Sequence, residues 1–136
     1  ATTLTIPSTA SLVITVAAYD ALTFSYADFS GRGPLTGESA SAVKPDLVAP
    51  GVNVSTISVG GGVAEFSGTS FATPFVTGSA ALLMEWGIVR GNDSYLYGEK
   101  VKAYLRRGAK PMPGFDEYPN EAVGYGRLCL SESIPK

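Results

Sequence analysis

The chain has 136 residues, of which 45% are hydrophobic and 16% are charged, and this is typical of one globular domain. Its net charge of -2 gives no basis for nucleic acid or an anionic membrane surface as a partner. With no histidine and one cysteine, Cys129, the sequence excludes an internal disulfide, a zinc site and a Cys-His catalytic pair. No uninterrupted apolar run reaches about 18 residues, so no membrane-spanning segment is predicted.

The first third of the chain predicts short buried strands separated by glycine- and proline-rich turns. Residues 12–18 form a nearly unbroken apolar run rich in β-branched side chains, which is typical of a strand covered on both faces. Residues 29–37 are dense in glycine and predict a loop. Lys44-Pro45-Asp46 predicts a turn before the apolar residues 47–49, with Asp46 as a local capping group.

A hairpin is predicted next. Residues 52–59 alternate branched apolar with small polar side chains, which favours a strand. The glycines at 60–62 turn the chain, and residues 63–66 predict a short strand that returns toward Ser70.

A buried helix is predicted from Thr69 or Ser70 to Gly87. Apolar and small residues recur there at three- and four-residue spacing, and Thr69 or Ser70 is expected to cap the helix. Pro74 falls within the opening turns, where a missing N–H costs least. Gly78 is expected to let the helix pack closely against a neighbour.

The last third predicts an amphipathic helix over residues 98–107, which ends at Gly108. Residues 110–120 predict a proline-rich loop, and residues 124–128 a brief extended segment. A basic cluster falls where the helix ends, and cations there interact favourably with the helix dipole, so it is interpreted as a solvated helix end: Arg106, Arg107 and Lys110.

Ser70 is the strongest candidate for chemistry, because it stands at the mouth of the predicted helix behind a glycine turn. A serine nucleophile needs an exposed Oγ on a rigid element and backbone N–H groups that face the developing oxyanion, and a helix N-terminus supplies those groups. Gly68 and Thr69 are the expected substrate-binding positions beside it. The tripeptide is equally a plain helix-capping signal, so these residues alone leave both interpretations open.

The segment from Gly68 to Gly78 resembles the serine-bearing motif of the subtilisin-like proteases (subtilases, peptidase family S8), Gly-Thr-Ser-x-Ala-Ser/Thr-Pro. Four further segments resemble family motifs in the same order: Ile14–Asp20, Phe29–Pro34, Lys44–Val52 and Gly124–Leu128. The resemblance implies an α/β fold, namely the C-terminal part of a three-layer subtilisin-like fold with a mostly parallel sheet. It implies that residues 1–136 are the serine-bearing part of one catalytic domain.

The resemblance also implies a function. Ser70 would be the nucleophile of a serine endopeptidase that works through an acyl-enzyme. The family's catalytic Asp and His come before the Ser in sequence order and would lie upstream of Ala1, so this chain alone is expected to be inactive. Its expected partners are the N-terminal half of the same domain and a peptide or protein substrate, and the isolated chain is expected to self-associate. The alternative is a non-catalytic subtilase-like module used for binding or assembly.

Some positions depart from the family pattern. Phe75 stands where many members have a histidine that is not the catalytic base, and Phe71 stands where methionine is frequent, on the leaving-group side. By analogy, the residues from Pro7 to Ala10 line the pocket for the substrate side chain. The related sedolisins use a glutamate as base, and Glu65 is the candidate that lies close in sequence, although strand geometry would point it into solvent.

The resemblance implies no resident cofactor. Calcium is common in the family, but the sequence holds no acidic cluster dense enough to predict a site, so no metal ligand is assigned. Secretion of the parent protein is compatible with the resemblance.

Overall fold

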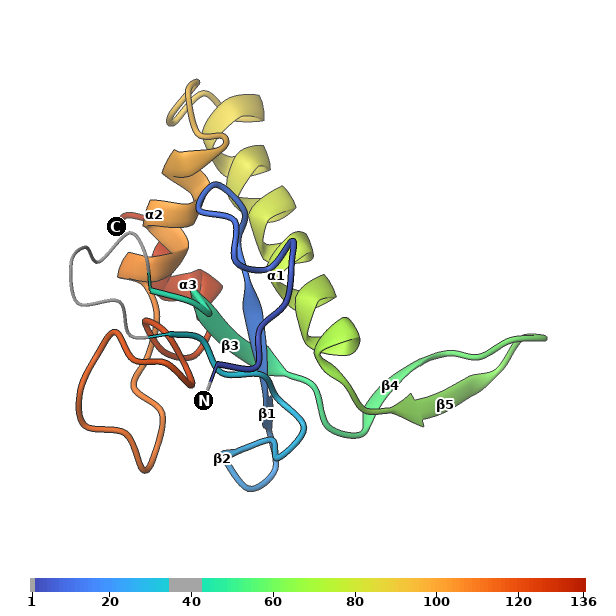
Figure 1. Ribbon diagram of the computed structural model, residues 1–136. Helices are drawn as coiled ribbons and strands as arrows, with labels where there is room; N and C mark the ends of the chain where they lie inside the picture. The colour runs from blue at the N-terminus through green and yellow to red at the C-terminus, as the bar shows by residue number, and fades with distance from the viewer. Residues whose placement is uncertain (1, 35–42) are drawn as a thin grey trace.

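The computed structural model describes residues 2–34 and 43–136, so the end of the predicted glycine-rich loop, residues 35–37, lies outside the described residues. Within them, a small sheet has the strand order β2-β1-β3 (Figure 1). β1 (Val16–Asp20) and β3 (Leu47–Pro50) run parallel, with Val16 opposite Leu47. The short β2 (Ser25–Tyr26) pairs antiparallel with the end of β1.

The predicted extended segment near the C-terminus extends this sheet beyond β3. Val48 N–H donates to Gly126 O at 3.0 Å, and Leu128 N–H donates to Val48 O at 2.9 Å, which gives a parallel bridge between Val48 and Arg127. The sheet is therefore mostly parallel, as the α/β prediction required.

β1 begins four residues later than the apolar run predicts. Leu12 is 79% exposed and Val13 is 41% exposed, so these residues do not enter the core. The carbonyl oxygen of Val13 accepts a hydrogen bond from the side chain of Lys44, at 2.6 Å, and thus bonds to a side chain outside any strand ladder. A tertiary contact has overridden the local β-propensity of this segment.

A hairpin separates the sheet from the long helix. β4 (Val54–Ile57) and β5 (Val63–Phe66) pair antiparallel, and the hairpin projects from the rest of the chain (Figure 1). The three glycines at 60–62 have φ between 88° and 91°, which only glycine adopts without strain, so the predicted turn is confirmed.

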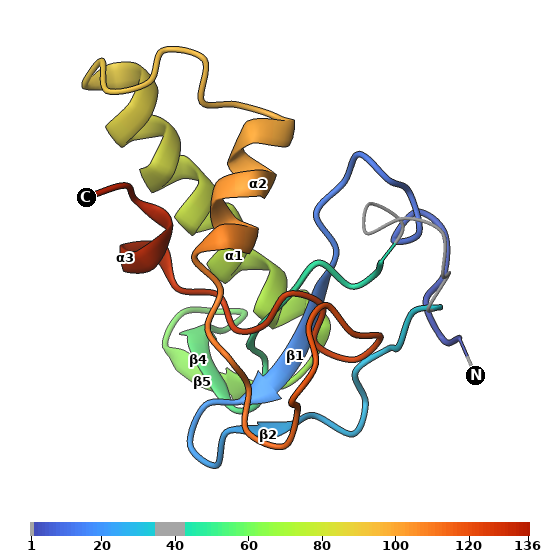
Figure 2. The same ribbon diagram turned by 90° about the vertical axis from the view of Figure 1, so that its left-hand side faces the viewer.

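The helices also lie where the sequence predicts, but the prediction that the first of them is buried holds for one side only, with Ala72, Val76 and Leu83 as its buried residues. α1 (Thr69–Met84) continues without a break into the π-helical turn η2 (Glu85–Val89), and α2 (Glu99–Arg107) lies along α1 (Figure 2). A short α3 (Leu130–Ser133) follows near the C-terminus. The predicted cap is wrong by one residue, because Gly68 is the N-cap of α1 and makes no side-chain cap bond.

Alternating strand residues divide the core between the two faces of the sheet. Ala18 and Ala49 face the helices together with Leu47, and α1 contributes Ala72 and Leu83 to that cluster. The other face is covered by irregular chain from the C-terminal part, in a second cluster: Ala17, Tyr19, Val48, Met112, Ala122 and Val123. Both faces of the short parallel strands are thus buried, which explains their apolar composition.

α1 together with η2 is long and apolar enough, by length and composition alone, to cross a membrane. The helix Thr69–Val89 has a mean hydropathy of 1.2, although polar residues interrupt its apolar runs. Its inner side contributes Ala72, Val76 and Leu83 to the core, while most of its apolar stretch is not buried within the described residues.

Asp46 is not a local capping group, and this prediction is corrected by the structure. Its carboxylate is fully buried, and Thr15 N–H donates to its Oδ2 at 2.8 Å. Within the described residues it also meets three cationic side chains: Lys44 Nζ at 2.7 Å, Lys102 Nζ at 3.3 Å, and Arg106 through Nε at 3.2 Å and through Nη2. Arg106 therefore belongs to a buried ion-pair cluster and not to a solvated helix end.

Replacing Asp46 by Asn should lower the free energy of unfolding by about 3–5 kcal/mol, because it leaves buried cations without a counter-charge. The change should be measured by chemical denaturation of the protein and compared with Asp116→Asn, which alters an exposed carboxylate. Equal stability of the two variants would contradict the importance of the cluster.

The same carboxylate makes stability depend on pH. Burial by itself raises the pKa of Asp46, but the hydrogen bonds from Lys44, Thr15 and Arg106 outweigh it and leave the pKa below its ordinary value of 3.8. Because the pKa is lower in the folded state, the stabilisation is complete well above pH 3.8 and is lost as the pH falls through the folded-state pKa. Melting temperatures below pH 4 should fall less steeply for Asp46→Asn than for the wild type.

Candidate active site

Ser70 is the second residue of α1, and its side chain is exposed. Among the described residues, its Oγ makes no hydrogen bond with any other group. The hydroxyl is therefore not used to cap the helix, which was the structural alternative to a catalytic role.

The turn that presents Ser70 rests directly on the end of β3. Gly68 N–H donates to Gly51 O at 2.8 Å, and Gly51 follows the last residue of β3. A Cβ atom at Gly51 would lie 2.6 Å from Ala18 Cβ and 2.9 Å from Gly68 O, so no larger residue fits without a shift of the backbone. Small residues thus fix the distance between the sheet and the start of α1.

The first turn of α1 offers backbone N–H groups beside the serine. Phe71 N–H and Ala72 N–H both donate to Gly68 O, at 3.0 and 3.3 Å. Helix geometry leaves the N–H groups of Thr69 and Ser70 without intrahelical acceptors. They lie at the positive end of the helix dipole, which favours an anion there. Gly68 and Thr69 flank this point, and their substrate-binding role stays a prediction.

A cavity of about 310 Å³ opens beside Ser70. Residues 13–16 form one wall with Pro7 and Ser8, while Thr69, Ser70 and Thr73 form the other. Of the residues expected to line a side-chain pocket, Pro7 and Ser8 do line this cavity.

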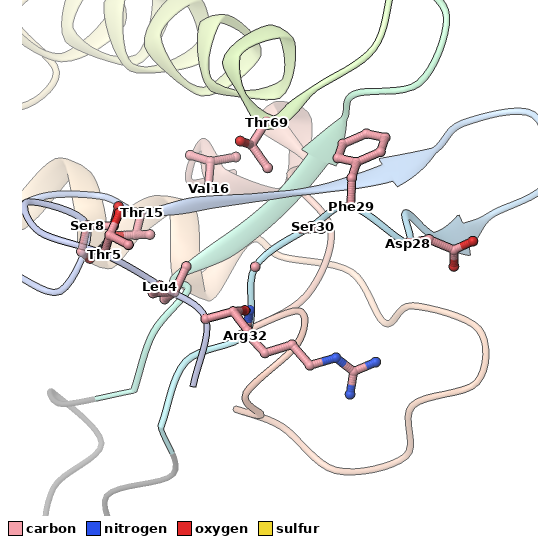
Figure 3. Close-up of a pocket in the computed structure, with 12 residues that line it drawn as sticks. Leu4, Thr5, Ser8, Thr15, Val16, Asp28, Phe29, Ser30, Arg32 and Thr69 are labelled. Carbon is pink, nitrogen blue, oxygen red and sulfur yellow. Dashed lines mark hydrogen bonds between the residues drawn. The ribbon is translucent and has the colours of Figure 1, made fainter. Parts of the chain in front are cut away.

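A second cavity, of about 520 Å³, adjoins the first and shares Ser8, Thr15, Val16 and Thr69 with it. Figure 3 shows Thr69 of α1 pointing toward Val16 of β1, with Phe29 beside them. The two cavities thus share part of their lining, at the start of β1 and of α1.

Aromatic side chains lie on the opposite side of Ser70. The rings of Phe66 and Phe71 are stacked with centroids 5.2 Å apart and an interplanar angle of 11°. Phe71, Pro74 and Phe75 also line a crevice of about 260 Å³ together with residues 54–56 of the hairpin. The expectation that Phe71 borders the leaving-group side stays a prediction, and its stacking on Phe66 was not predicted.

The other ionisable candidates have different roles. Glu65 is exposed on β5, opposite Ser55, as its strand position predicted. Lys44 is 3% exposed, and its ammonium group is bound to Asp46 and Val13. Neither side chain is hydrogen-bonded to Ser70. In residues 2–34 and 43–136, no three acidic or cysteine side chains gather closely enough to hold a metal ion.

Sequence reasoning missed several residues of this site. Thr15 and Val16 line the cavity, and Gly51 supports the serine turn, but these residues come from segments that are far from Ser70 in the chain. Gly51, which follows Ala49-Pro50, is recognisable in the sequence as a turn residue. The sequence does not indicate that the Gly68 turn lies against it.

The comparisons with known proteins agree with this geometry. A family model described as the subtilase family matches residues 1–126. The serine protease AprX of Bacillus subtilis (strain 168) is 31% identical over 98% of this chain and 32% of its own length. The minor extracellular protease Vpr of the same organism is 32% identical over 79% of this chain and 13% of its own length.

A solved structure is similar over almost the whole chain. The CspB protease of Clostridium perfringens is 46% identical, with a TM-score of 0.87, over 94% of this chain and 27% of that chain. This chain therefore spans about a third or less of the length of these relatives. Sequence and structure together show that the chain belongs to the subtilase family.

Proposed function

We propose that residues 1–136 are the serine-bearing part of the catalytic domain of a subtilisin-like serine endopeptidase, with Ser70 as the nucleophile. One observation supports the proposal: in a chain of this family, the Ser70 hydroxyl is exposed at a helix N-terminus beside a cavity, and it makes no hydrogen bond within residues 2–34 and 43–136. The names of the AprX and CspB relatives describe proteases.

The reaction divides into two halves. Ser70 Oγ attacks the carbonyl carbon of a peptide bond, a C–O bond forms, and the serine proton passes to a base. The Ser70 N–H, which has no intrahelical acceptor, binds the resulting oxyanion. Collapse breaks the C–N bond, and the amine leaves with the proton from the base. Water then hydrolyses the ester on Ser70 and frees the enzyme.

The base comes from outside this chain, because the chain has no histidine. In the proposal, the N-terminal half of the same domain supplies the His and Asp of the triad. In subtilisin itself, loss of the catalytic serine or histidine alone lowers kcat about 10⁶-fold, which is about 8 kcal/mol of barrier. The isolated chain is therefore inactive in this proposal.

The exposed side of α1 is where that half would dock. Phe75 and Leu82 of α1 are 42% and 57% exposed and lie seven residues apart, so they share one side of the helix. Gly78 lies between them in sequence, and apart from its chain neighbours and the backbone of its own helix, no atom of the described residues lies within 4 Å of a Cβ placed on it. The described residues thus do not supply the close neighbour that was expected at Gly78. In the proposal, the N-terminal half of the domain packs against this position.

The proposal also places the parent protein outside the cytoplasm, because the name of the Vpr relative describes an extracellular protease.

A fluorophosphonate probe should label Ser70 in the full-length protein. Labelling should disappear in Ser70→Ala, because the probe reacts only with an activated nucleophile. Mass spectrometry of the labelled peptide would locate the adduct. A full-length protein that stays unlabelled and cleaves no peptide would favour the alternative, a non-catalytic module for binding or assembly.

Gly51→Ala should lower kcat/KM of the full-length protein by about 100-fold, because the added methyl group displaces the Gly68 turn and a shift of about 1 Å at a nucleophile costs that much. The readout is peptidase kinetics, with a melting curve to show that the variant is folded. A folded variant with wild-type kcat/KM would show that the contact between Gly51 and Gly68 does not position Ser70.

The isolated chain should self-associate or bind a hydrophobic dye, because the apolar side of α1 is uncovered. Leu82→Glu should weaken both effects, while Leu22→Glu, at a residue 87% exposed in the turn after β1, should leave them unchanged. Sedimentation and dye fluorescence would measure these effects. A monomer that binds no dye would argue against a missing partner on α1.

A further inference from the structure

The segment that precedes β1 has few apolar contacts to hold it. From residue 5 to residue 13 every side chain is exposed except the half-buried Ser8, and Ile6 and Leu12 are 88% and 79% exposed. Its position therefore depends on hydrogen bonds to its backbone. Thr15 Oγ1 donates to Ser8 O at 2.5 Å and fixes one point of the segment.

Lys102 of α2, 91 residues further along the chain than Ser11, fixes a second point at Ser11 and shares a third, Val13, with Lys44. Its Nζ donates to Ser11 O at 2.6 Å and to Val13 O at 3.0 Å. Its side chain is only 5% exposed, so water does not compete strongly for these contacts. In Figures 1 and 2 the segment rises beside α2 before it turns into β1.

Charge balance does not explain why Lys102 is there. Lys44 and Arg106 already neutralise Asp46, the carboxylate of this cluster among the described residues. Burial lowers the pKa of Lys102 below 10.5, Asp46 opposes that change, and Lys44 and Arg106 lower it further. Burying an extra cation costs free energy, and Lys102 gains two backbone carbonyl acceptors in return, in addition to its 3.3 Å contact with Asp46.

The segment held in this way is a wall of the cavity beside Ser70. Pro7, Ser8 and Val13 line that cavity, and Ser70 and Thr73 face them across it. We infer that Lys102 is a positioning residue for substrate recognition: it holds the segment 7–13 at the distance from Ser70 that a substrate side chain requires. This inference rests on the proposed peptidase function.

Two probes on the full-length protein separate positioning from general stability. A small fluorophosphonate reports only whether Ser70 is activated. A peptidyl phosphonate with a bulky side chain before the phosphorus atom also needs the pocket. Lys102→Met keeps the length of the side chain but removes its donors, and Asp46 keeps Lys44 and Arg106 as partners.

Lys102→Met should label with the small probe at the wild-type rate, and with the peptidyl probe about tenfold more slowly, a factor that corresponds to about 1.4 kcal/mol. KM for a matching peptide should rise by a similar factor with little change in kcat. Lys102→Arg should recover part of the loss. The matched control is Lys100→Met on the same helix, because Lys100 pairs with Asp93 and does not touch the segment.

Equal rates for Lys102→Met and wild type with the peptidyl probe would overturn the inference, and so would an equal loss with both probes. A wild-type protein that reacts with neither probe would overturn the proposed function, and the inference with it. The two failures are thus distinguishable.

Discussion

The buried carboxylate of Asp46 is the interaction on which the arrangement of this chain depends. Removing a charge from water costs several kcal/mol unless well-placed partners compensate, so the folded state must bring those partners to Asp46. The partners come from distant places: Thr15 at the start of β1, Lys44 two residues upstream, and Lys102 and Arg106 on α2. The sheet, the segment before it and α2 are thereby joined at one point.

β3 links this cluster to the candidate active site. The strand has only four residues, and Asp46 precedes its first residue while Gly51 follows its last. At the Gly51 end, backbone contact with Gly68 seats the turn that carries Ser70. A short strand paired on both sides has little freedom to bend, so the ion-pair cluster at one end and the serine turn at the other hold a fixed separation. A nucleophile must be held rigidly, and β3 with the contacts at its two ends holds the Ser70 turn in this way.

Local patterns predicted most of the helices and strands and the position of Ser70 at the start of a helix, but not the contacts between these elements. The period of the α1 sequence and the glycines at 60–62 act through neighbouring residues, and both predictions hold in the structure. Asp46 was misinterpreted because a Lys-Pro-Asp turn looks the same whether its carboxylate caps the turn or meets a helix 60 residues later. The start of β1 was wrong for the same reason, since side chains from elsewhere bind the Val13 carbonyl. The role of Asp46 and the start of β1 could not be predicted because the residues that determine them lie far apart in the sequence.

The three cations around Asp46 also contact other groups, and these further contacts give the two lysines a different structural role from Arg106. Lys44 binds Val13 O, and Lys102 binds Ser11 O as well as Val13 O, so the two ammonium groups hold the wall of the cavity in place.

Arg106 instead lies over the ring of Tyr125, with its guanidinium carbon 4.6 Å from the ring centroid. A planar guanidinium stacks on an aromatic face as an ammonium does not, so Arg106 is suited to this contact. Tyr125 N–H in turn donates to Asp46 O at 2.9 Å, directly before the residues that extend the sheet beyond β3. The cations around Asp46 therefore hold two parts of the chain: the lysines hold the wall of the cavity, and Arg106 holds the C-terminal edge of the sheet. Because the two lysines hold one part and Arg106 holds the other, a lysine-arginine exchange that preserves the total charge would still change which part of the chain is held.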